Sequence, residues 1–218
     1  MRALLIALCL VAVAVAAGAA VAATGEKEQI HLTKADQAAA KRAVAVRSDL
    51  GSGNWTGGYT KPDLSQSSSC ATFHPKQADL VVTGAAEADW TEQGLQLETV
   101  AQVLKTPAMV AADWRRTILA PGAAACLRTR LLKDLGKGFT FVSFRRVIFA
   151  PVATNAQAFL MLVDVKTNTG KVRVAIQFVA ITRGRTELTV VSIVQNAVQK
   201  VVAQIDAQIA RALVARAA

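Results

Sequence analysis

Residues 139–193 constrain the fold of this chain more than any other stretch. They contain four successive apolar segments, and the last three are joined by short turns at 167–170 and 183–185. In the segment that follows Gly170, Val172, Val174 and Ile176 alternate with other residues, which is the period-two pattern of a strand. Consecutive strands joined by short turns form an antiparallel meander. In the first segment, Arg145 and Arg146 interrupt the apolar run, and we expect a β-bulge there.

Two further strands are expected upstream of this run, at 78–92 and 95–103. Leu95, Leu97 and Thr99 alternate with other residues in the second of them, and Gln93 and Gly94 form the turn that connects the two. Together with the four segments above, this hairpin predicts an antiparallel sheet of about five or six strands.

Helices are expected on both sides of the strand run. Thr33 is the predicted cap of a first helix that ends near residue 48, and Thr106 with Pro107 begins a second. A further helical piece follows the break at 121–122 and stops at Gly136. The last helix is amphipathic, and its apolar stripe comprises Val198, Val201, Val202, Ile205, Ile209 and Leu213.

That last helix must bury its apolar face, and the sheet is the nearest apolar surface. The alternative is a helix that lies on a membrane surface, which its lack of aromatic residues disfavours. The sequence therefore predicts an α+β fold in which an antiparallel sheet packs against helices, including the C-terminal one.

The N-terminus has the features of an export signal. Arg2 precedes an uncharged stretch, residues 3–23, and Val21, Ala22 and Ala23 match the small-residue pattern of a cleavage site. We interpret 1–23 as a signal peptide, 24–30 as a flexible N-terminus and 31–218 as one domain. An uncleaved segment that anchors the chain in the membrane is the alternative, since the apolar run is long enough to span a bilayer. Either interpretation makes the protein secreted or bound to the cell envelope.

Two cysteines, Cys70 and Cys126, follow the predicted signal. In an exported protein an even pair of cysteines predicts one disulfide, and two buried free thiols are the alternative. The bridge would enclose about 55 residues and would fasten the long loop before Cys70 to the helix that contains Cys126.

Candidate ligand contacts are few. The loop 51–69 is rich in Gly and Ser but contains Trp55 and Tyr59, which are candidate aromatic contacts; the alternative is that Trp55 only plugs the loop onto the core. Arg183 and Arg185 crowd one turn, where a bound anion or plain solvation are both open. We expect any binding site to lie between this loop and the sheet.

Catalytic and metal-binding motifs are not found in the sequence. Only His31 and His74 are present as histidines, no Cys or His spacing fits zinc, and no serine elbow, P-loop or dinucleotide-binding glycine motif occurs. The sequence predicts no cofactor. Carboxylates are the remaining acid–base candidates, and surface or ion-paired roles are commoner for them than catalysis. The candidates are Glu87, Asp89, Glu92 and Glu98 on the expected hairpin and Asp164 and Glu187 on expected strands. Asp113 and Arg116 lie one helical turn apart and are expected to pair.

The formal net charge is +10, and the basic residues are spread along the whole chain. A nucleic-acid interface concentrates its basic residues on one face and interleaves aromatics, so this even spread and the export signal argue against nucleic acid as a partner. A weak association with an anionic envelope surface is the milder expectation.

The stretch LTKADQAAAKRAVAVRSDLGSGNWTGG, a helix that leads into an Asp-Leu-Gly…Trp segment, resembles openings of the extracellular PknH-type sensor domains and related exported envelope proteins of actinobacteria. The resemblance extends to the general layout of residues 31–216, and the Ala- and Arg-rich composition is compatible with such a source. Such sensor domains usually contain two disulfides, whereas only one is available here. The resemblance implies a fold and a compartment and transfers no functional residue.

These observations favour a non-catalytic module that binds an unknown ligand or envelope protein. An exported hydrolase with an unrecognised site is the alternative, and a structural envelope-interaction protein is a third interpretation. A deep cavity between sheet and helices would favour ligand binding. A cleft with His74 or two close carboxylates would favour the hydrolase.

Overall fold

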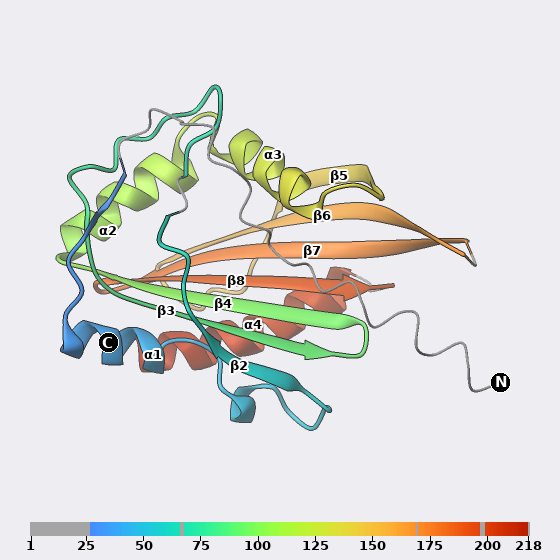
Figure 1. Cartoon of the computed structure of the whole chain (residues 1–218), viewed down its shortest axis with the longest axis horizontal. Helices are drawn as coiled ribbons and strands as arrows, with labels where there is room; N and C mark the ends of the chain where they lie inside the picture. Colours follow the sequence, from blue (N-terminus) through green and yellow to red (C-terminus); the bar gives the residue numbers. More distant parts are fainter. Residues whose placement is uncertain (1–26, 66–67, 169, 197–198, 218) are drawn as a thin grey trace.

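One antiparallel sheet lies between two layers of helices in the computed structural model, which describes residues 27–65, 68–168, 170–196 and 199–217 (Figure 1). The sheet has eight strands. The predicted α+β class is confirmed, but the expected five or six strands were too few. The predicted signal peptide lies outside the described residues.

The predicted hairpin and meander form the centre of the sheet. The hairpin consists of β3 (Val81–Glu92) and β4 (Leu95–Leu104), and the meander of β6 (Asn155–Thr167), β7 (Gly170–Arg183) and β8 (Thr186–Gln195). The strand β5 (Phe139–Val147) pairs with β6 at the edge of the sheet. The strand order is β3-β4-β8-β7-β6-β5, so the hairpin joins the meander through the pairing of β4 with β8.

The two strands that the sequence interpretation missed both pair with β3. β1 (Gln29–Ile30) runs parallel to its beginning, and β2 (Thr56–Thr60) runs antiparallel to its end. β2 lies in the stretch expected to be a loop, and its glycine-rich sequence shows no alternation. Gly57 has φ +136° and lies so close to the backbone carbonyl of Asp89 that any Cβ would overlap it. The pairing of β2 with β3 therefore requires a glycine at position 57. Glycine is uncommon inside strands, so the sequence does not indicate a strand here.

The register shift in β5 falls between Phe141 and Ser143, not at Arg145 and Arg146 as expected. Both arginines pair in register with β6, and the guanidinium of Arg146 lies 5.6 Å from the ring centre of Phe159. This cation–π contact adds a favourable interaction at the paired position of Arg146.

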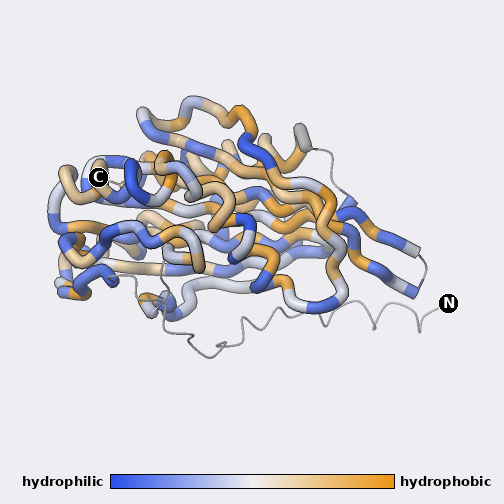
Figure 2. Tube along the Cα trace, turned by 90° about the horizontal axis from the view of Figure 1, so that it is seen from above, coloured by the Kyte–Doolittle hydropathy of each residue, from blue (hydrophilic) through white to orange (hydrophobic). Residues whose placement is uncertain are grey.

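Helices α1 (Lys34–Arg42) and α4 (Gln199–Arg216) cover one face of the sheet, while α2 (Pro107–Asp113) and α3 (Ala123–Leu135) cover the other (Figure 1). The α1/α4 side holds the main core, in which apolar residues alternate along the strands and meet both helices (Figure 2). Gly84 allows the close approach of α1, because a Cβ there would overlap the backbone of Asp36.

The first helix begins where the sequence predicts and ends earlier. The Thr33 hydroxyl accepts a hydrogen bond from the Asp36 amide at 3.1 Å, as a cap does. The helix ends at Arg42 instead of near residue 48, and a 3₁₀ turn follows at Arg47–Asp49. The reason is that the buried backbone of Ala45 bonds to the sheet side chains Thr99 and Trp90 and no longer to helical partners.

The C-terminal helix buries Val202, Ile209 and Leu213 against the sheet as predicted, whereas Val201 is 46% exposed. The sequence interpretation did not include Asp206, which is fully buried on the same face. Within the described part of the chain, no helix combines the length and apolarity that a membrane crossing requires.

Candidate functional site

A cavity of about 970 Å³ lies between the sheet and the layer formed by α2, α3 and the loop before them. This layer contacts the sheet through two separate apolar clusters, one under α3 and one under α2, and not through one continuous core. The volume is at the upper end of the range for small-molecule sites. Apolar residues of both layers line it: Trp114, Leu127, Leu131, Leu135, Phe159, Ile176, Phe178, Val191 and Ile193.

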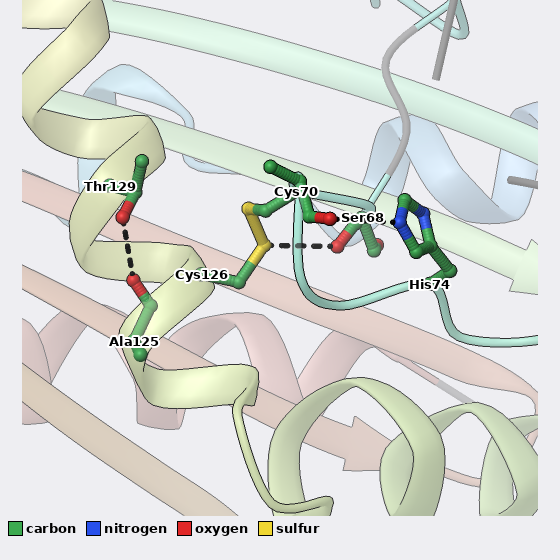
Figure 3. The surroundings of a disulfide bond; sticks show 7 residues. Ser68, Cys70, His74, Ala125, Cys126 and Thr129 are labelled. Carbon is green, nitrogen blue, oxygen red and sulfur yellow. Dashed lines mark hydrogen bonds between the residues drawn. A yellow bond between two sulfur atoms is a disulfide. The ribbon is translucent and has the colours of Figure 1, made fainter. Parts of the chain in front are cut away.

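The predicted disulfide between Cys70 and Cys126 is present and fastens the wall of this cavity (Figure 3). Cys126 lies on α3 and lines the cavity, and the carbonyl oxygen of Ser68 lies 3.4 Å from its Sγ. The loop that the bridge holds also supplies lining residues, among them Leu64 and Phe73. The bridge therefore connects the two parts of the chain that close the cavity.

The charges around the cavity are the reverse of those of the whole chain. Of 15 acidic residues in the sequence, eight line this one cavity, whereas among the basic residues that the structure describes only Lys27 and Arg130 do so. The eight acidic residues are Glu28, Asp63, Glu87, Asp89, Glu98, Asp113, Asp134 and Glu187. The cavity lining, which includes the exposed residues Asp63 and Asp134, is thus strongly acidic in a protein with a net charge of +10.

One group of carboxyls, here called the Glu187 cluster, comprises Glu28, Asp113 and Glu187 together with the buried amide of Gln77. The Gln77 Nε2 donates to Asp113 Oδ1 at 3.3 Å and to Glu28 Oε1 at 3.4 Å. The Thr117 hydroxyl lies 3.3 Å from Asp113 Oδ2. Glu187 Oε1 is buried and has no hydrogen-bond partner among the described residues.

Burial is the main reason why the Glu187 cluster holds protons tightly. Burial, with the negative charge of Asp113, raises the pKa of Glu28 to about 7. Burial also raises the pKa of Asp113, and the pKa of Glu187 is raised well above its usual range by burial and by the charges of Asp113 and Glu28. Three carboxyls whose charges interact in a buried site cannot all ionise at neutral pH without a counter-charge.

A second group, here called the Glu98 cluster, comprises Glu87, Asp89 and Glu98 on β3 and β4, with Asp134 on α3. Asp89 and Glu98 stand directly opposite each other in the ladder. Burial, then the charges of Glu87, Asp89 and Asp134, raises the pKa of Glu98 to about 7. The hydroxyl of Thr60 on β2 donates to Glu87 at 3.1 Å, so the unexpected strand contributes to this cluster.

The two clusters lie on the same sheet face and are well separated. Glu98 is paired with Val191, which is four residues from Glu187 along β8, a distance of about 13 Å at the usual rise of a strand. Val100 and Thr189, which are paired with each other, line the cavity between them. The cavity is therefore elongated, with acidic groups at two ends of an uncharged strip.

The four residues predicted as ligand contacts do not line this cavity. The Tyr59 hydroxyl donates to the Lys41 carbonyl oxygen at 3.0 Å, and Arg185 forms an ion pair with Asp36 at 2.6 Å. Arg183 is exposed at the end of β7. Trp55 packs against the main core and lines a separate cavity of about 370 Å³, in agreement with its role as a plug. The structure places these four residues in different parts of the molecule.

The remaining candidates also lie outside the cavity or take different partners. His74 is exposed on the loop, with Nε2 3.3 Å from the Ala71 carbonyl oxygen (Figure 3), and His31 is exposed too. Arg116 pairs with Asp79 at 2.7 Å, so its expected pairing with Asp113 was wrong. In the described part of the chain, no three His, Cys, Asp or Glu side chains are placed to hold a metal ion.

From the sequence, Glu87, Asp89, Glu98 and Glu187 were acid–base candidates for which a surface or ion-paired role was the commoner interpretation, and Glu28 was not identified. A signal was nevertheless present. The four residues alternate with buried neighbours, which places them on one sheet face. Which helices cover that face was not apparent from the sequence.

Comparison with known proteins gives distant structural likeness alone. No known family model matches the sequence, and no curated protein matches it. Among solved structures, the extracellular domain of PknH from Mycobacterium tuberculosis is similar, with a TM-score of 0.44 and 10% sequence identity, over 81% of this chain and 95% of that chain. The resemblance to such domains is therefore a distant structural one.

Proposed function

We propose that this chain is an exported, non-catalytic binding module whose cavity takes a small ligand. The observation that carries the proposal is the cavity of about 970 Å³ between the sheet and the α2/α3 layer. It combines an apolar lining with a few charged groups, as ligand sites do. The uncharged N-terminal stretch and the disulfide support an extracytoplasmic location. Sensor-like binding of a ligand or partner in the envelope fits this arrangement.

Native mass spectrometry of the protein purified from its exporting host tests the proposal. The wild-type chain is expected to retain a small molecule that denaturation releases. A Thr189→Trp variant is expected to lose it, because Thr189 lies in the middle of the cavity strip. The matched control is Thr140→Trp, which adds the same side chain at an exposed position of β5.

Both variants must first show the far-UV circular dichroism and cooperative melting of the wild type. If the wild type has no bound molecule and no small-molecule panel shifts its melting temperature, the proposal is wrong. A ligand that both tryptophan variants retain equally would place the binding site elsewhere.

A second candidate function, acid–base hydrolysis, is favoured by one observation. Asp113 and Glu187 are in hydrogen-bond contact, and their raised pKa values suit one group that holds a proton and one that accepts it. We expect turnover by this pair to disappear in Glu187→Gln with substrate affinity retained. Bound ligand that is recovered chemically unchanged after prolonged incubation would exclude this function.

A further inference from the structure

We propose that the ligand of the large cavity is an elongated dication, an aliphatic diamine or polyamine, with one ammonium group at the Glu187 cluster and one at the Glu98 cluster. This inference deepens the proposed function and rests on it. What it adds is the chemical class of the small molecule that the cavity holds.

The charges of the residues that line the cavity favour a cationic ligand. Carboxyl-bearing residues outnumber cationic ones by eight to two among the described residues that line the cavity, in a chain with ten more basic than acidic residues. A cavity of one charge sign with low-dielectric walls raises the local concentration of ligands of the opposite sign. An anionic ligand would meet repulsion at both ends, and a neutral one would leave most of the carboxyls without counter-charge, since Lys27 and Arg130 are the two cationic side chains among the described lining residues.

One carboxyl oxygen of Glu187 lies buried without a hydrogen-bond donor among the described residues. A buried carboxyl oxygen without a donor is costly, because a buried polar group loses its hydrogen bonds to water. Glu187 Oε1 is in this position, and its side chain lines the cavity. An ammonium has three donors and no acceptor, so it supplies the missing bond and the counter-charge together.

The distance between the Glu187 cluster and the Glu98 cluster favours an elongated ligand. The two clusters are about 13 Å apart along the sheet, and an uncharged strip that includes Val100 and Thr189 lies between them. Phe159 and Phe178 add apolar surface to the same cavity. A ligand with two terminal charges and a hydrocarbon chain between them matches this order, whereas a compact cation would contact one cluster only.

Proton release is a consequence that binding experiments can detect. A bound ammonium favours the charged form of a neighbouring carboxyl, so it lowers pKa values that burial has raised to about 7 at Glu28 and Glu98. Affinity should therefore rise between pH 6 and pH 8. The charged groups that face the ligand are Glu28, Asp113, Glu187, Glu87, Asp89, Glu98, Asp134, Asp63, Lys27 and Arg130.

Isothermal titration of the full chain with four probes tests the proposal. The probes are 1,8-diaminooctane, octylamine, 1,8-octanediol and octanoate, which share a hydrocarbon chain and differ in terminal charge. We expect the diamine to bind at least tenfold more tightly than octylamine, with octanediol weaker and octanoate not bound. Titration in two buffers of different ionisation enthalpy should reveal release of about one or two protons.

Variants locate the two ends. Glu98→Gln and Glu187→Gln keep the shape of each side chain and remove its charge, and each should weaken diamine binding at least tenfold. The control Asp164→Asn removes a carboxylate of β6 that pairs with Arg173 outside the cavity, and it should change affinity less than twofold. Both glutamine variants mimic the protonated side chains, so we expect them to fold.

The outcomes separate this inference from the proposed function. If octanediol or octanoate binds as tightly as the diamine, the dication is wrong while the binding module stands. If none of the four probes binds and no retained molecule is found, both proposals are wrong. Equal affinity for octylamine and the diamine would show that only one cluster is used and would overturn the two-ended site.

Discussion

Asp206 is the residue with the most unfavourable surroundings on the α4 side of the sheet. Its side chain is fully buried between α4 and β8, where Oδ2 accepts a hydrogen bond from the Ser192 hydroxyl at 3.0 Å and Oδ1 has no partner among the described residues. The buried amide of Gln177 faces the same carboxyl. Burial raises the pKa of Asp206 to about 7, so ionisation of this side chain at higher pH destabilises the folded protein.

This residue predicts a pH dependence of stability. The folded pKa of Asp206, about 7, lies above its ordinary value of 3.8, so the folded state binds the proton more tightly than the unfolded state. The contribution of this residue to stability is therefore full below pH 3.8 and is lost as the pH rises through 7. Asp206→Asn removes the titration, and we expect the variant to be more stable than the wild type at pH 8 by up to about 4 kcal/mol.

Urea unfolding at pH 5, 6.5 and 8 measures this effect. The difference between variant and wild type should grow with pH. The change Asp164→Asn should show no such growth, because the ion pair with Arg173 lowers the pKa of Asp164 below its usual value. A difference that is constant across the three pH values would contradict the assigned pKa.

For individual residues, the sequence predicted on which face of a strand a side chain lies better than it predicted whether that side chain is buried. The alternation of Leu97, Thr99 and Ala101 with Gln96, Glu98 and Val100 correctly separates the two faces of β4. A strand face with Gln and Glu is usually taken as solvent-exposed. Here the α2/α3 layer covers that face without filling the space, and such a long-range contact has no local signal in the sequence.

At the scale of elements, the disulfide fixes the lining loop to α3. The bridge joins residues 56 apart, with Cα atoms 5.6 Å apart, and the loop entropy that it removes from the unfolded chain corresponds to roughly 3–5 kcal/mol. We expect a Cys70→Ser, Cys126→Ser double variant to lose stability by this order. Ligand affinity should fall further than stability alone explains, because both sides of the bridge line the cavity.

Unfolding of the wild type with and without reductant gives the first quantity, and titration of the folded double variant gives the second. A double variant that binds ligand as well as the wild type would mean that the loop does not help to form the site. The even number of cysteines after the predicted signal peptide predicted this bridge. The positions of the two cysteines in the sequence do not indicate the cavity beside it.

The end of α4 is held to the α1 region by Arg216. Its guanidinium donates to both carboxylate oxygens of Asp49, at 2.7 and 2.8 Å, and to the carbonyl oxygens of Arg42 and Val44. A lysine has no planar fork and cannot form this set of bonds. We expect Arg216→Lys to destabilise the protein by about 1–2 kcal/mol and to accelerate amide hydrogen exchange in the last turns of α4.

The matched control is Arg211→Lys, an exposed position of the same helix. Hydrogen exchange that is equally fast in both variants would show that Arg216 does not hold the helix end. This contact was not predictable from the sequence, since nothing local to Arg216 indicates that Asp49 lies beside it.

At the scale of the whole molecule, acidic and basic groups are segregated. More than half of the acidic residues line one interior cavity, so the outer surface is more positive than the net charge of +10 suggests. A positive outer surface is attracted to anionic lipid headgroups, and salt screens this attraction. We propose a weak association with the anionic envelope surface.

Sedimentation with lipid vesicles measures that association. We expect the protein to sediment with vesicles that contain anionic phosphatidylglycerol at low ionic strength, to remain in the supernatant at high salt, and to ignore neutral phosphatidylcholine vesicles. Equal sedimentation with both vesicle types would contradict an electrostatic origin.

The central claim is that the acidic cavity between the sheet and the α2/α3 layer holds a ligand with a cationic group at each end. A crystal structure of the full chain with 1,8-diaminooctane measures this most directly. We predict electron density along the strip between β4 and β8, with one nitrogen within hydrogen-bond distance of Glu187 and the other within that distance of Glu98. An empty cavity in crystals saturated with the diamine, or density only on the outer surface, would contradict the claim.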